Sequence, residues 1–146
     1  MKAMLAAIGM MGMFGLMGSS ATAMAASRAV LPLACPATQD VIASSLCAQI
    51  RQALKRATPS IQTRPHVNAP AYLALDITEI TATSLFARLS WHPSTGDVIH
   101  GPTRGLRVSD AQLHPQMVRA LADDLVARSG FDFHALARTP ARQEKN

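Results

Sequence analysis

Residues 72–92, YLALDITEITATSLFARLSWH, decide the fold of this chain. Apolar side chains recur at every second position in both halves of the stretch, which is the spacing of two half-buried β-strands. The link Thr81–Thr83 between them is short enough for a hairpin. We therefore expect an antiparallel hairpin with one clearly apolar face.

The register of this hairpin follows from the same pattern, because a slip of one residue would turn one strand over. A turn centred on Ala82 pairs Leu73 with Trp91, Leu75 with Leu89, and Ile77 with Ala87. On the opposite face the same register pairs Asp76 with Arg88, a favourable cross-strand charge pair.

The second face of the hairpin would carry Tyr72, Phe86, Arg88 and His92. Tyr, Phe and Arg are enriched at the centres of protein interfaces, so these four residues are a candidate interaction face. Two other interpretations remain open. The face is simply solvated, with Arg88 satisfied by Asp76, or the proline-rich stretch 58–70 crosses over it.

Helices are expected on both sides of the hairpin. Apolar residues at three- and four-residue steps predict a helix from Thr38, a suitable N-cap, to the stop at Pro59. After short strands at 97–100 and 105–108, a second helix is expected between Pro115 and Gly130. Both helices have a single apolar stripe.

This order of elements predicts an α+β fold, a two-layer sandwich. We expect an antiparallel meander of three or four strands with both helices packed on one face. The organisation along the chain is a signal peptide (1–25), an irregular N-terminal segment (26–37), a single α+β domain (38–136) and a flexible tail (137–146).

The N-terminus has the three-part layout of a secretory signal peptide. Lys2 precedes an uncharged apolar core over residues 3–17, and small residues at 21, 23 and 25 offer two cleavage sites. We expect cleavage near residues 23–26 and a periplasmic location. An uncleaved membrane anchor is the alternative, because residues 3–27 are long enough to span a bilayer. A lipoprotein acylated at Cys35 is a weaker one, since Pro32 replaces the leucine of a lipobox.

Cys35 and Cys47 are the two cysteines of the chain. In an exported protein an even cysteine count indicates a disulfide, which here would tie the N-terminal segment to the first helix. A reactive thiol or an intermolecular bridge is the functional alternative.

The composition and the motif content of the chain argue against several classes of function. The net charge is +5, but aromatic residues are only 4% of the chain, which argues against a base-stacking nucleic-acid platform. None of the five histidines is spaced as in HxxxH or HExxH, and no GxSxG or GxxxxGK[ST] motif occurs. We therefore expect no metal, no cofactor and no catalytic residues.

The sequence thus favours a small exported, non-enzymatic binding or accessory protein of the cell envelope. Its partner would be an envelope protein or a small ligand. A histidine-based metal-handling protein, a small periplasmic enzyme and a membrane-tethered accessory subunit are the alternatives.

Overall fold

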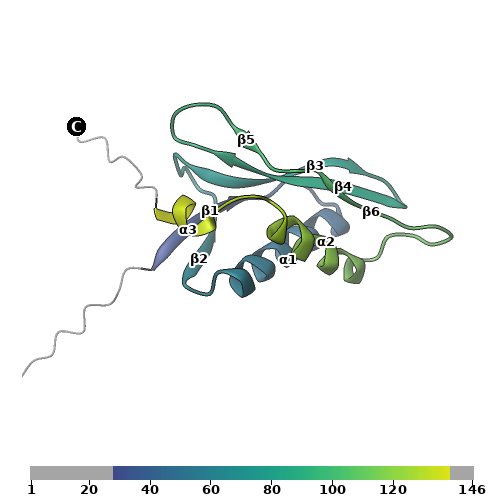
Figure 1. Ribbon diagram of the computed structural model, residues 1–146. Coiled ribbons are helices and arrows are strands. Elements are labelled where there is room, and N and C mark those ends of the chain that lie inside the picture. The colour runs from purple at the N-terminus through teal and green to yellow at the C-terminus, as the bar shows by residue number, and fades with distance from the viewer. Residues whose placement is uncertain (1–27, 139–146) are drawn as a thin grey trace, which may run out of the picture.

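The computed structural model describes residues 28–138. The predicted signal peptide 1–25 and all but the first two residues of the predicted tail 137–146 lie outside this range. The chain is an α+β protein in which a six-stranded sheet carries helices α1 and α2 side by side on one face (Figure 1). The elements are β1 (Ala29–Ala34), α1 (Val41–Ala57), β2 (Ile61–Pro65), β3 (Tyr72–Ile80), β4 (Ser84–His92), β5 (Ile99–His100), β6 (Arg104–Arg107), the 3₁₀ turn η1 (Pro115–Met117), α2 (Val118–Ala127) and α3 (Phe133–Arg138).

The β3–β4 hairpin has the predicted register. Leu73 pairs with Trp91, Leu75 with Leu89, and Asp76 with Arg88. A bulge between Ile77 and Glu79 shifts the pairing near the turn. The alternating apolar side chains of both strands lie in the core, fully buried except for the partly buried Ile77, so the apolar alternation correctly predicted which side chains face inward.

The prediction of a purely antiparallel meander is wrong, because the sheet is mixed. Its strand order is β2-β1-β3-β4-β5, with β6 also on β4, and β1 runs parallel to both β2 and β3. Residues 26–37 were expected to be irregular, yet Ala29–Ala34 is a strand. Likewise, part of the expected crossing 58–70 is β2.

The proline at position 32 argues against a strand at residues 29–34, which is why β1 was not predicted. The structure shows why this proline is tolerated in the strand. The N–H of His66 donates to the carbonyl of Leu33, so the backbone groups of Leu33 face β2. Those of the preceding Pro32 then face β3, but β3 pairs only with Leu33 and Ala34. The missing N–H of Pro32 therefore costs no hydrogen bond of the ladder.

The two predicted helices differ from the predictions at their ends, and a third helix is present. The N-cap of α1 is Asp40, whose carboxylate accepts from the N–H of Ala43, rather than Thr38. The turn η1 begins at Pro115 and leads into α2, and α3 adds a third helix that packs on β1. The apolar side chains of α1 and α2 form one core with the inward side chains of the sheet. The largest apolar residues that are less than 2% exposed are Leu31, Leu33, Leu46, Ile50, Leu54, Leu73, Leu85, Leu89, Leu125 and Val118.

Candidate functional site

The outer face of the sheet, opposite α1 and α2, carries the four residues of the predicted interaction face. Tyr72 and His92 are directly paired across β3 and β4, and their rings stack at 4.6 Å with an angle of 6°. His66, which follows β2, adds a third ring 4.0 Å from Tyr72. The stretch 58–70 therefore touches this face at Tyr72, while its strand lies at the edge of the sheet.

Phe86 has a partner of its own. It pairs with Gly105 on β6, and a Cβ atom placed on that glycine would lie 2.2 Å from the Phe86 ring. The ring thus covers the space that Gly105 leaves open. The Arg107 guanidinium lies 5.2 Å from the ring centroid and completes a cation–π contact.

Arg88 lies 3.5 Å from Asp76, as the sequence predicted. The Ser90 hydroxyl donates to the same carboxylate at 2.5 Å and lies 2.8 Å from Nδ1 of His100. These residue types could form a nucleophilic site. However, Ser90 is 0% exposed, and the acid and the base both contact the hydroxyl itself. The trio is therefore a polar network in which two partly exposed side chains, Asp76 and His100, satisfy the buried Ser90 hydroxyl.

The remaining histidines are dispersed. His114 caps η1 by accepting from the N–H of Gln116, and His134 lies on α3. Residues 28–138 contain no group of three or more His, Cys, Asp or Glu side chains that could hold a metal ion. No helix within this range is long and apolar enough to cross a membrane.

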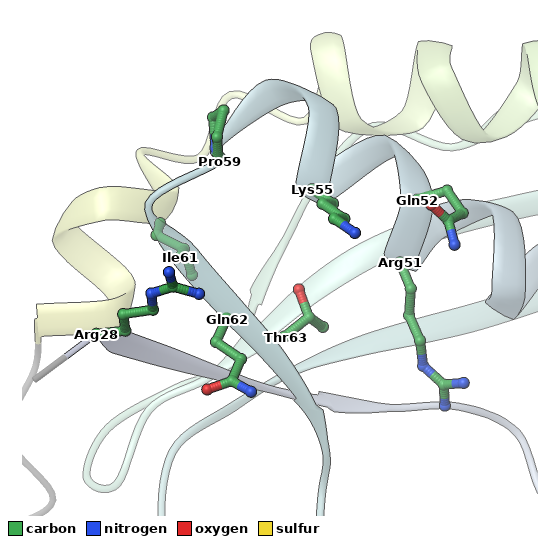
Figure 2. A pocket seen from close by; sticks show the side chains of 8 residues that line it. All are labelled: Arg28, Arg51, Gln52, Lys55, Pro59, Ile61, Gln62 and Thr63. Atoms are coloured by element: carbon green, nitrogen blue, oxygen red, sulfur yellow. The ribbon is translucent and has the colours of Figure 1, made fainter.

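The structure reveals a second surface that the sequence analysis did not identify. A cleft of about 310 Å³ lies between α1 and the edge strand β2 (Figure 2). We call it the basic cleft. It is lined by Arg28, Arg51, Gln52, Lys55, Pro59, Ile61, Gln62 and Thr63.

Local structure explains how these residues meet. Lys55 lies four residues after Arg51 and three after Gln52, so both of these side chains are neighbours of Lys55 on the same side of α1. Figure 2 shows Lys55 and Thr63 directed into the space between the helix and β2, with Arg28 and Gln62 beside the strand. The parallel pairing of β1 with β2 brings Arg28, next to Ala29, close to Ile61.

The cysteine pair supports the helix side of this cleft. Cys35 follows β1 directly, Cys47 is buried on α1, and their Cα atoms are 6.0 Å apart, with the sulfur atoms at disulfide distance. Arg51, one turn after Cys47, places its Nη2 4.0 Å from the sulfur of Cys35. The pair thus joins α1 to the sheet next to the basic cleft.

The charges of the basic cleft are of one sign. None of its eight lining residues is acidic, and the ion pairs found within residues 28–138 involve none of its three cations. The pairs lie elsewhere, as with Arg104 and Arg128 on Asp124. The hydrogen bond from Arg104 lowers the pKa of that carboxyl below its ordinary value. Within residues 28–138, positive charge is therefore paired with acidic side chains beside α2 but not between α1 and β2.

Comparison of the chain with protein-family models, with curated proteins and with solved structures finds no match. The chemistry of the two surfaces is therefore the basis for a functional proposal.

Proposed function

We propose that this protein is a small exported binding protein of the cell envelope, without enzymatic activity, and that its ligand is anionic and occupies the basic cleft. The observation that carries this proposal is the grouping of Arg28, Arg51 and Lys55 around one cleft with no acidic residue. Like charges held together repel one another, and a bound anion relieves that repulsion.

The dimensions and chemistry of the cleft support binding. Its volume of about 310 Å³ is at the small end of the range for ligand sites. Two amide side chains and a hydroxyl, from Gln52, Gln62 and Thr63, stand beside the cations and can donate further hydrogen bonds. Carboxylates and phosphates accept such bonds, and arginine binds both in a bidentate manner.

The outer face supports the proposal less well. Tyr72 and His92 are stacked on each other, Phe86 lies over Gly105, and Arg88 faces Asp76. Each of the four predicted residues is thus engaged inside the chain, whereas the cations of the basic cleft form no ion pair within residues 28–138. For this reason the cleft replaces the outer face as the proposed binding surface. The export of the protein rests on the N-terminal sequence pattern.

Calorimetric titration with inorganic pyrophosphate at low ionic strength tests the proposal. Lys55→Gln and Arg51→Gln should each weaken binding about fivefold, because an exposed charge contact is worth about 1 kcal/mol. Arg119→Gln is the matched control, since it removes one exposed charge on α2, away from the cleft. Equal losses in all three variants, or no binding by the wild-type protein, would contradict the proposal.

A further inference from the structure

The edge strand β2 gives the basic cleft a second property, an open row of backbone groups. Within the described sheet β2 has a neighbour on one side only, β1. Since the His66 N–H donates to Leu33, the even-numbered residues of β2 face β1, and the N–H and C=O of Thr63 point to the open side. Open strand edges are templates for pairing with another extended chain.

The basic cleft lies along this open edge of β2. Gln62 and Thr63 point to opposite faces of β2 because side chains alternate along a strand, yet both line the cleft. The cleft therefore wraps around the edge of the strand. A further strand added there would lie within the cleft, along the face of α1 that carries Arg51 and Lys55.

The charges of this edge select the occupant. A second copy of the chain would bring the cations of its own β2 edge against those of the first, which is the usual protection of edge strands against self-association. An acidic segment would meet opposite charges instead. Its alternate side chains would point to the two faces of β2, toward the residues that line the cleft on either side.

We propose that the open edge of β2 accepts an extended, acidic polypeptide segment of a partner protein as an additional strand of the sheet. The backbone of Thr63 pairs with the segment, and Arg28, Arg51 and Lys55 bind its carboxylates. This inference rests on the proposed function, because it names the anionic ligand of the same cleft.

The edge also limits how much pairing is available. The N–H of Ile61 already donates to the carbonyl of Thr58, and Pro65 has no N–H. Among the outward-facing residues 61, 63 and 65, Thr63 is thus the main backbone donor. The added strand is short, and its affinity depends on both the Thr63 N–H and the charges.

The test uses a capped heptapeptide of alternating glutamate and valine, its fully N-methylated form of equal charge, and inorganic pyrophosphate. We expect the unmethylated peptide to bind about tenfold more tightly than the methylated one, because only it can donate backbone hydrogen bonds. Thr63→Pro should abolish this difference, because the proline ring stands where the Thr63 N–H pointed and keeps the added strand from approaching. Since the substitution also removes a hydroxyl that lines the cleft, its pyrophosphate affinity is compared with that of Thr63→Val, which lacks the same hydroxyl, and the two should be equal. Thr63→Val keeps the N–H and is the matched control.

The outcomes separate the two proposals. Equal affinity for both peptides, with pyrophosphate still bound, would overturn strand addition and leave the anion site standing. Failure of all three probes to bind would overturn the proposed function as well. Two further results would also overturn the inference, because the edge would then bind a different occupant. One is dimerisation of the free protein, measured by light scattering, that Thr63→Pro disrupts. The other is displacement of the peptide by long-chain polyphosphate at concentrations much lower than that of the peptide.

Discussion

The contact of Phe86 with Gly105 predicts that substitutions at these two positions are strongly coupled. In Gly105→Ala the new Cβ would lie 2.2 Å from two atoms of the Phe86 ring, where ordinary contact begins at 3.4 Å. The ring must therefore leave its place between Gly105 and Arg107. Overpacking of this kind costs about 1–3 kcal/mol of unfolding free energy.

The same substitution should behave differently once the ring is absent. Phe86 is only half-buried, so Phe86→Ala alone should cost about 1–2 kcal/mol, less than the loss of a fully buried phenylalanine. In that background Gly105→Ala meets no ring, and alanine in a strand is favoured over glycine by about 0.5–1 kcal/mol. The coupling energy between the two sites should therefore be about 1.5–4 kcal/mol.

Urea unfolding of the wild-type protein, the two single variants and the double variant measures this coupling. Trp91 is the sole tryptophan of the chain and is 5% exposed, so its fluorescence reports loss of the core. Arg107→Gln is a control that should cost only about 0.5–1 kcal/mol, the strength of an exposed cation–π contact. Additivity of the two single variants within about 0.5 kcal/mol would refute the packing of Phe86 on Gly105.

Three further predictions concern other parts of the chain. Non-reducing peptide mapping should find Cys35 linked to Cys47, and reduction should lower the unfolding free energy by about 2–3 kcal/mol; native thiols that react with a maleimide would contradict this. The lowered pKa of Asp124 means that its carboxylate stabilises the fold above pH ~4, the unfolded value, and that this contribution is lost as pH falls through the folded pKa. Arg104→Gln should therefore flatten the acid side of the stability profile, and an unchanged profile would count against the pairing. Intact mass of protein from the periplasm should show loss of the first 23–26 residues, whereas recovery of Met1 in the membrane fraction would indicate an anchor.

Sequence reasoning predicted the hairpin well because its information is local. Alternation over residues 72–92 and one pair of opposite charges, Asp76 and Arg88, determine a single register. The apolar stripes of α1 and α2 were equally easy to recognise in the sequence. Where one face of an element must be buried, period and composition leave few choices.

The parallel strands were missed for two different physical reasons. In β1 the proline at position 32 interrupts an apolar alternation, and only the partial pairing with β3 makes it harmless. In β2 the sequence IQTRP has a single large buried apolar residue, Ile61, because an edge strand buries little. Neither strand carries the local signal that β3 and β4 carry.

The basic cleft could not be predicted because it is assembled by topology. Arg28 is separated from Arg51 by β1, a loop and more than half of α1, and β2 closes the site only after the parallel crossover. One local signal was present. Arg51 and Lys55 are like charges at i and i+4, an arrangement that is unfavourable on an isolated helix and suggests a compensating partner.

The central claim is that an anionic ligand binds between α1 and β2, and amide chemical-shift mapping tests it most directly. The ¹⁵N-labelled protein is titrated with pyrophosphate while all backbone amides are followed. We predict that the shifts concentrate in residues 51–55 and 61–63, and that they disappear in Lys55→Gln. Shifts centred on Tyr72, Phe86 and His92, or spread over every exposed arginine, would contradict the account.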